Sequence, residues 1–401
     1  MRVTARSVLA GACIGAAGAL AAAPACAPAW AQTSEPYRID VVLPLTGGGA
    51  FLGRAEQQSL QTLQKSLAPG ALKGRPVEFT FHDDQSSPQV AVQLATQLSR
   101  ATPKPAVVLG SALVAMCNAM APLMRSGPVL YCFSPGIYPP ADSYVFSSSV
   151  ATRDLAAGLL RYAGARGWTR VALITSTDAS GQDAVRNIKG LLAQPENKAL
   201  QLVAEQSFNP TDVSASAQVE RLKGADPQLL IAWTTGAPVG TVFKAVLDAG
   251  WDIPVATTNG NMTYAQMTQY AAFLPKQLYI PSSPWPKEET PHLSAGAEQK
   301  KDAFFKAFAG TGVKPDGPAS FAWDPAAITL DALRSLGPDA TAQQLRDYLA
   351  KLKGYDGING TYDFVKLPQR GLDESNVVIT RWDAGKGAFD VVSEPGGLPL
   401  K

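Results

Sequence analysis

Residues 39–49 read IDVVLPLTGGG, and they contain the unit from which the rest of the chain is built. The apolar run over 39–45 is typical of a strand that is buried on both faces, and the glycines that follow end it. Leu60, Leu63 and Leu67 then recur at helical spacing. A buried strand, a glycine-rich turn and an amphipathic helix are therefore predicted in that order.

The same alternation continues in two series. The first series adds predicted strands at 77–82, 106–109 and 129–133. The second series starts near residue 152 and has predicted strands at 170–175, 200–206, 229–233 and 255–258. Strands separated by helices of about 10–15 residues imply right-handed crossovers and parallel sheets. The predicted fold class is α/β, with two doubly wound parallel-sheet lobes.

The last third of the chain has a less regular pattern. Helices are predicted at 295–309, 318–336 and 342–352, and strands at 277–283, 361–365, 376–382 and 388–392. Thr341 and Gln344 have the spacing of a capping box, which marks the start of the last helix.

Composition excludes several classes of protein. The 401 residues exceed one ordinary domain, and 46% hydrophobic residues suffice for real cores. If Arg2 and Arg6 are removed with a signal peptide, 33 Lys and Arg remain against 33 Asp and Glu, and the net charge is zero. A neutral chain argues against a nucleic-acid partner. His82 and His292 are the two histidines, so we expect neither a metal site nor a histidine-based hydrolase.

The first 31 residues have the pattern of a cleavable secretory signal. Arg2 and Arg6 precede an uncharged stretch, and Ala29-Trp30-Ala31 is an A-x-A cleavage site. A membrane anchor, or lipoprotein processing at Cys13 or Cys26, are the alternatives. Because no later segment has 18 uncharged apolar residues, we expect a soluble mature chain in the periplasm.

Two cysteines remain in the predicted mature chain. Cys117 lies on the apolar face of a predicted helix, and Cys132 lies in the strand that follows. An exported protein can form a disulfide between such neighbouring elements. The alternative is a pair of buried thiols that act as small hydrophobic side chains.

The motifs of common enzymes are missing from the sequence. It contains no phosphate loop of the G-x-x-x-x-G-K-[ST] type, no G-x-S-x-G, no H-E-x-x-H and no C-x-x-C. A dinucleotide fingerprint that starts at Gly47 fails because Leu52 occupies its sixth place. Asp178 and Ser180 follow a strand but have no evident histidine partner. We therefore expect no cofactor and no enzymatic activity.

Seven short stretches together resemble one family. They are VVLPLTG at 41–47, DDQSSP at 83–88, VVLGS at 107–111, FSPG at 133–136, SGQ at 180–182, AWDPAA at 322–327 and GING at 357–360. In order and spacing they are similar to the type I periplasmic solute-binding proteins of branched-chain amino acid (Leu/Ile/Val) ABC transporters. The resemblance spans residues 37–393.

The resemblance implies two lobes joined by a three-stranded hinge. One lobe is expected to comprise 37–151 and 281–351, and the other 152–280 and 352–393. A small-molecule solute would bind between the lobes, an inner-membrane ABC permease would receive it, and the protein would be a monomer. Strand-end loops supply the expected ligand-binding residues: Leu52, Ser111, Leu113, Val114, Ser134, Gly136, Tyr138, Ser180, Trp233, Thr235, Asn259 and Asn261.

The sequence departs from the amino-acid binders of this family at their anchoring positions. Leu113 or Val114, and Tyr138, stand near the places where the family holds an α-carboxylate with Ser or Thr. Ser180 replaces a frequent Tyr, and Asn259 or Asn261 replaces the acid that pairs with the α-ammonium. A buried ammonium without a carboxylate partner is costly. We therefore expect an aromatic or aliphatic carboxylate rather than a standard branched-chain amino acid. The alternative function is a ligand sensor that reports to a membrane receptor.

Overall fold

The computed structural model describes residues 35–286 and 293–400. The signal peptide, the lipoprotein and anchor alternatives, and His292 lie outside the described residues.

The first lobe is built on a five-stranded sheet with the order β2-β1-β3-β4-β5, in which every pair is parallel. Its strands are β1 (Tyr37–Leu43), β2 (Val77–Asp83), β3 (Val107–Gly110), β4 (Val129–Cys132) and β5 (Val145–Ser147). Its helices include α1 (Ala50–Ser66), α2 (Pro88–Ser99), α3 (Val114–Met120) and the 3₁₀ turn η1 (Ala121–Met124). β1 lies inside the sheet, and Val41, Val42 and Leu43 at its end are fully buried, whereas Arg38 at its start is exposed.

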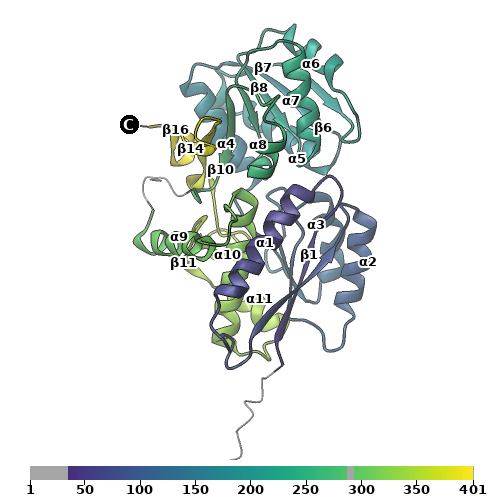
Figure 1. The fold of residues 1–401 in the computed structure, drawn as a ribbon, viewed down its shortest axis with the longest axis vertical. Coiled ribbons are helices and arrows are strands. Elements are labelled where there is room, and N and C mark those ends of the chain that lie inside the picture. The colour runs from purple at the N-terminus through teal and green to yellow at the C-terminus, as the bar shows by residue number, and fades with distance from the viewer. Residues whose placement is uncertain (1–34, 287–292, 401) are drawn as a thin grey trace, which may run out of the picture. The chain divides into compact units, whose positions relative to one another are not determined.

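The second lobe has a seven-stranded sheet with the order β14-β13-β10-β9-β8-β6-β7 (Figure 1). Its strands are β6 (Arg170–Ser176), β7 (Gln201–Phe208), β8 (Leu229–Trp233), β9 (Val255–Thr257), β10 (Leu278–Ser282), β13 (Val378–Asp383) and β14 (Ala388–Val391). Its helical segments are α4 (Thr152–Ala165), α5 (Ala179–Leu192), η2 (Pro195–Asn197), α6 (Ser216–Lys223), α7 (Pro238–Asp248), η3 (Asn259–Asn261) and α8 (Tyr264–Gln269). The predicted α/β fold of two lobes is confirmed, although β13 and β14 are antiparallel to their neighbours.

The last third adds elements to both lobes. They are α9 (Ala295–Phe308), α10 (Gly317–Leu336), α11 (Ala342–Ala350), β11 (Lys353–Gly357), β12 (Gly360–Asp363), η4 (Glu374–Asn376), β15 (Ser393–Glu394), η5 (Pro395–Gly397) and β16 (Leu398–Pro399). The capping box of Thr341 and Gln344 is present at the start of α11. α10 packs along α1 and belongs to the first lobe.

A buried carboxylate fixes the β11–β12 hairpin to α10. Asp324 on α10 accepts hydrogen bonds from the backbone N–H groups of Ile358 and Asn359, both at 2.9 Å, and from the Tyr362 hydroxyl at 3.0 Å. Burial raises the pKa of Asp324, and these donors oppose that rise. The sequence predicted that residues 352–393 belong to the second lobe. These contacts favour assigning the β11–β12 hairpin to the first lobe instead.

A disulfide joins Cys117 on α3 to Cys132 at the end of β4, with 6.1 Å between their Cα atoms. Both residues are fully buried in an apolar cluster with Met116, Met120 and Leu130. The sequence left open a disulfide or two buried thiols, and the structure has the disulfide. It ties the helix after β3 to the next strand of the sheet.

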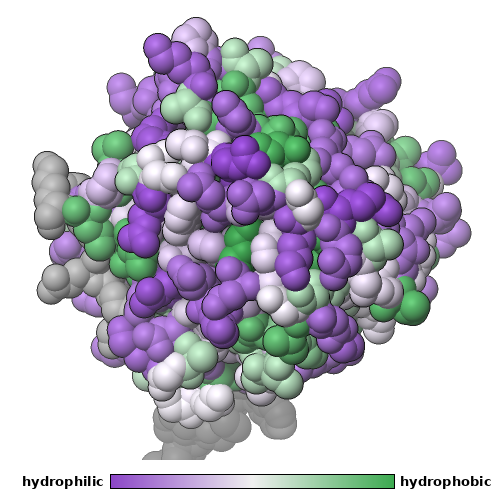
Figure 2. Space-filling model, turned by 90° about the horizontal axis from the view of Figure 1, so that it is seen from above, coloured by the Kyte–Doolittle hydropathy of each residue, from purple (hydrophilic) through white to green (hydrophobic). Residues whose placement is uncertain are grey.

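The view from above in Figure 2 shows hydrophilic residues over most of that face, with hydrophobic residues in small separate groups. Such a distribution is ordinary for a surface that contacts water. Within residues 35–286 and 293–400, no helix has the length and apolar character needed to cross a membrane.

Candidate ligand-binding site

A cavity of about 350 Å³ lies where the carboxyl ends of strands from both sheets meet. The first lobe contributes loops after β1, β3 and β4, and the second contributes loops after β6, β7, β8 and β9. Parallel strands place their carboxyl ends at one edge of a sheet, so the loops that follow them gather there. The expected region of the ligand site is therefore a real cavity between the two lobes.

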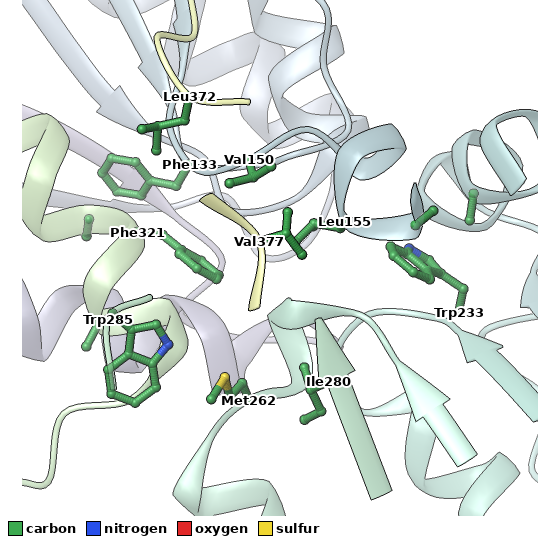
Figure 3. Packing of buried hydrophobic residues seen from close by; sticks show 14 of the residues in the cluster. Phe133, Val150, Leu155, Trp233, Met262, Ile280, Trp285, Phe321, Leu372 and Val377 are labelled. Atoms are coloured by element: carbon green, nitrogen blue, oxygen red, sulfur yellow. The ribbon is translucent and has the colours of Figure 1, made fainter. Parts of the chain in front are cut away.

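Apolar side chains form much of the cavity wall. Those lining it include Leu52, Leu113, Val114, Phe133, Trp233 and Phe321. Figure 3 shows Phe133 and Phe321 from the first lobe, and Trp233 and Ile280 from the second, among the buried residues where the lobes meet. Trp233 is the last residue of β8 and is only 1% exposed. Such a wall suits a ligand with a hydrocarbon or aromatic body.

Neutral polar groups are placed between these apolar residues. Ser180 and Thr235 share a hydrogen bond of 2.9 Å between their hydroxyl oxygens. The Asn259 amide donates to the Ser149 hydroxyl at 3.3 Å and its oxygen accepts from Thr258 at 3.1 Å. Ser134 also lines the cavity, and its hydroxyl accepts from the Gly136 N–H at 3.4 Å. These groups carry no formal charge and can form hydrogen bonds with a ligand.

Asp178 is the one ionisable side chain among the described residues that line the cavity. Its Oδ1 accepts from the Ser176 hydroxyl at 2.9 Å and from the Gly181 N–H at 3.0 Å, which caps α5. Asp178 thus serves the start of α5 through Oδ1, and its second oxygen, Oδ2, keeps its capacity to accept a hydrogen bond. The described lining contributes no Lys or Arg side chain, so a ligand's charge would be met by neutral dipoles.

The start of α3 supplies such dipoles. Leu113 is its N-cap and makes no side-chain hydrogen bond to the first turn. The first N–H groups of an α-helix have no acceptor within the helix. Val114, Ala115 and Met116 carry these groups, and all three line the cavity. Residues 114–116 have apolar side chains, but their backbone N–H groups are candidate hydrogen-bond donors to a ligand.

The structure brings eight of the twelve predicted ligand-binding residues to this cavity. They are Leu52, Leu113, Val114, Ser134, Ser180, Trp233, Thr235 and Asn259. The remaining four are Ser111, Gly136, Tyr138 and Asn261, and none of them lines it.

Ser111 and Asn261 are occupied by the structure that supports the loops. The Ser111 hydroxyl donates to the Asp84 carboxylate at 2.5 Å. The Asn261 oxygen accepts from the Gly236 N–H at 2.8 Å, and its amide donates to the Thr234 carbonyl at 2.7 Å. Both side chains are fully buried and hold neighbouring loops in place.

Gly136 and Tyr138 lie outside the cavity because the chain turns away after Pro135. A Cβ on Gly136 would lie 2.6 Å from Val114, so glycine permits this loop to approach α3. The Tyr138 ring is half exposed, and its hydroxyl accepts from the Asn187 amide on α5 at 3.0 Å. Tyr138 is therefore a contact between the lobes rather than a wall of the cavity.

The lining residues that were not predicted from the sequence include Ser86, Thr152 and Phe321. Ser86 belongs to the DDQSSP stretch at 83–88, and Phe321 directly precedes the AWDPAA stretch at 322–327. The first of these motifs therefore contained a signal for Ser86, and the second lies next to Phe321. Thr152 is the first residue of α4, and no sequence pattern pointed to it.

The chain belongs to the periplasmic binding protein family, whose model matches residues 36–387. The predicted family is confirmed. Its members are periplasmic and bind small-molecule ligands without catalysing a reaction. No curated protein matches the chain.

Solved structures share this fold at low sequence identity. An extracellular ligand-binding receptor from Rhodopseudomonas palustris HaA2 is 19% identical, with 90% of this chain and 100% of that chain covered and a TM-score of 0.75. The branched-chain amino acid transporter substrate-binding protein LivJ from Streptococcus pneumoniae, in complex with isoleucine, is 20% identical, with coverages of 89% and 99% and a TM-score of 0.73. An ABC transporter solute-binding protein from R. palustris, in complex with benzoate, is also 20% identical, with coverages of 91% and 100% and a TM-score of 0.73.

Proposed function

We propose that this protein captures a small organic carboxylate with an aromatic or branched aliphatic body and delivers it to an inner-membrane ABC permease. The observation that carries the proposal is the lining of the interlobe cavity. Its wall is largely apolar, its hydrogen-bonding groups are mostly neutral, and the late loop presents Asn259 where an amino-acid binder would place an acid.

The ligand's two ends have different partners in this proposal. Trp233, Phe133 and Leu113 contact the hydrocarbon part, whose burial contributes about 25 cal/mol per Å² of apolar surface removed from water. The backbone N–H groups at 114–116 and nearby hydroxyls donate hydrogen bonds to the carboxylate, because helix N-termini favour anions. The cavity of about 350 Å³ is at the lower end of the usual range for small-molecule sites.

Two structural neighbours were solved with ligands of different chemical classes. One was solved with isoleucine and the other with benzoate, and each is 20% identical to this chain. Both ligands contain a carboxylate, but isoleucine also has an ammonium. In this cavity, the single acid is Asp178, whose Oδ1 already accepts two hydrogen bonds. The largely apolar wall, with one described acid that is used to cap α5, supports benzoate-like ligands over amino acids.

A thermal-shift screen of the refolded, ligand-stripped mature chain tests the ligand class. The panel contains benzoate, phenylacetate and isovalerate, with leucine, isoleucine and valine as the competing class. A ligand at about 100 times its dissociation constant adds roughly 2.7 kcal/mol to stability. We expect clear shifts with the carboxylates alone. A shift with any of the three amino acids, and none with the carboxylates, would contradict the proposed specificity.

The transport role has a separate test. The ligand-loaded mature protein should bind a membrane-embedded ABC permease in a pull-down, and deletion of that permease should abolish uptake of the solute. Capture of a receptor instead would favour the sensor alternative. We propose a monomeric state, which size-exclusion chromatography with light scattering checks. Mass spectrometry of the exported chain should find Gln32 at its N-terminus if the predicted signal is cleaved.

A further inference from the structure

A second cavity, of about 430 Å³, lies next to the first turn of α1. Neighbouring residues of that turn face different cavities. Leu52 lines the proposed ligand site, whereas Phe51 lines this second one. The second cavity also contacts α8, the end of α9 and the segment 313–316, so it is formed by elements of both lobes. We call it the α1–α8 pocket.

Aromatic and aliphatic side chains form the apolar part of the α1–α8 pocket. Phe51, Tyr264, Phe308 and Val313 line it. Phe51 packs edge-on against Tyr270, with 6.0 Å between the ring centroids, which fixes the ring at the pocket wall. An aromatic ligand ring has suitable partners here.

Two cations lie at the rim of this pocket. The Arg54 Nε donates to the Leu45 carbonyl at 3.2 Å. The Lys314 ammonium donates to the Gly387 carbonyl at 2.8 Å and lies 4.1 Å from the centroid of the Tyr264 ring. Within the described part of the chain, neither cation forms a salt bridge. Neither charge is therefore paired with a described carboxylate.

The pocket contains one acid, Asp316, at its base. The Asp316 carboxylate accepts from the Ala319 N–H at 3.1 Å and caps α10. Burial raises the pKa of Asp316 to about 7. At neutral pH this group therefore carries only part of a negative charge, and the pocket as a whole is positive.

We propose that the α1–α8 pocket is a second small-molecule site that takes an organic anion with an aromatic body. The apolar side chains receive the ring, and Arg54 and Lys314 bind the anionic group. A cavity of this volume fits a small molecule rather than a folded partner. Because the pocket is formed by both lobes, a ligand in it contacts both of them. The site is independent of the solute proposed for the interlobe cavity.

Photolabelling with 4-azidobenzoate tests the proposal on the intact mature chain, with mass-spectrometric peptide mapping as the readout. We expect saturable label on peptides that contain 51–58 or 264–269, with benzoate as competitor. The double variant Arg54→Gln, Lys314→Gln should need about tenfold or more probe for the same label, because it removes charge-assisted hydrogen bonds. Lys65→Gln with Arg100→Gln is the matched control, since both residues are exposed and the net charge is the same.

Three outcomes would overturn the second site. The first is no saturable label on those peptides, and the second is equal labelling of the double variant and the wild type. The third is equal labelling by the neutral 4-azidobenzamide, which would exclude an anion. Label on peptides containing 113–116 or 233–235 reports on the interlobe cavity instead. Absence of label on those peptides would count against the proposed function. It would not count against a ligand site in the α1–α8 pocket.

Discussion

The backbone N–H of Ala237 donates to the carbonyl of Gly48 at 2.9 Å and so joins the second lobe to the first. Gly48 follows β1, and Ala237 precedes α7. Gly236, the residue before Ala237, has φ +84°, and a Cβ placed on it would collide with the Gly48 carbonyl oxygen. Glycine at 236 thus permits the two loops to meet beside the ligand cavity.

Gly236→Ala should weaken ligand binding, because the added methyl group keeps the loops of the two lobes apart. We expect an affinity loss of about tenfold or more, measured by calorimetry with the best ligand from the thermal-shift screen. Gly167→Ala is the matched control, since Gly167 has φ +75° but open space around it. Equal affinity losses in the two variants would assign the effect to backbone strain instead.

Trp233→Ala should weaken binding by about tenfold or more, because it removes apolar contact with the ligand. Trp233 is almost fully buried, so the variant should also lose roughly 3–5 kcal/mol of stability. Trp285→Ala is the control, since Trp285 is equally buried but does not line the cavity. Calorimetric affinities and chemical unfolding separate the two effects. Unchanged affinity in Trp233→Ala would remove this residue from the site.

Arg370→Met should destabilise the chain and loosen the loop after β4. The buried guanidinium donates to the carbonyls of Ser149 at 3.0 Å and Pro135 at 3.2 Å, and also to that of Ile137. Removing it leaves buried acceptors without donors, each at a cost of about 1–3 kcal/mol. Urea unfolding measures the loss. Arg370→Lys retains the charge but lacks the planar fork, so it should recover only part of the stability.

The stability of the chain should fall as pH rises through the acidic range. Burial raises the pKa of Asp316 from its usual 3.8 to about 7. Between these two values the folded state binds more protons than the unfolded state, so the free energy of unfolding decreases with rising pH. Asp316→Asn keeps an oxygen for capping α10 and should flatten this slope, as measured by urea unfolding between pH 4 and pH 8.

Asp373→Asn is the control for that slope. Burial acts to raise the pKa of Asp373, but hydrogen bonds from Ser375 and Lys366 outweigh it and lower the pKa below its usual value. This acid therefore contributes stability that is present at neutral pH and is lost on acidification. Its variant should leave the decrease between pH 4 and pH 7 in place. An unchanged slope in Asp316→Asn would contradict the role given to that residue.

Reduction of the Cys117–Cys132 disulfide should lower stability by about 3 kcal/mol, the usual size for a loop of some 15 residues. Thermal unfolding with and without a reductant measures the difference. A thiol titration of the unfolded, unreduced mature chain should find no free thiol at these positions. Two free thiols would contradict the bridge.

The sequence predicted the fold because its strongest signals are local. The apolar run at 39–45 corresponds to β1 (Tyr37–Leu43), in which the consecutive residues 41–43 are buried on both faces of the sheet. The capping box at Thr341 is likewise a pattern within four residues. β5 (Val145–Ser147) was missed, because a strand of three residues has too few positions to show a period.

The candidate site could be predicted only as far as its loops. Any residue after a parallel strand lies at the correct edge of its sheet, which is why Ser134 and Ser180 line the cavity. Tyr138 is four residues beyond Ser134, yet it binds Asn187 on the other lobe. The direction of a side chain within a loop depends on contacts with residues far away in the sequence. A single sequence does not show those contacts.

The sequence by itself determined the alternation of strands and helices, the two lobes and the family, since each follows from short-range periodicity and motif order. Only the tertiary structure decided which side chains share a cavity. Leu52 and Phe51 are neighbours, but helical geometry turns them to different sides of α1 and so into different cavities. What each cavity contains is then set by the other lobe, because α8 and the loops after β8 and β9 complete the two walls.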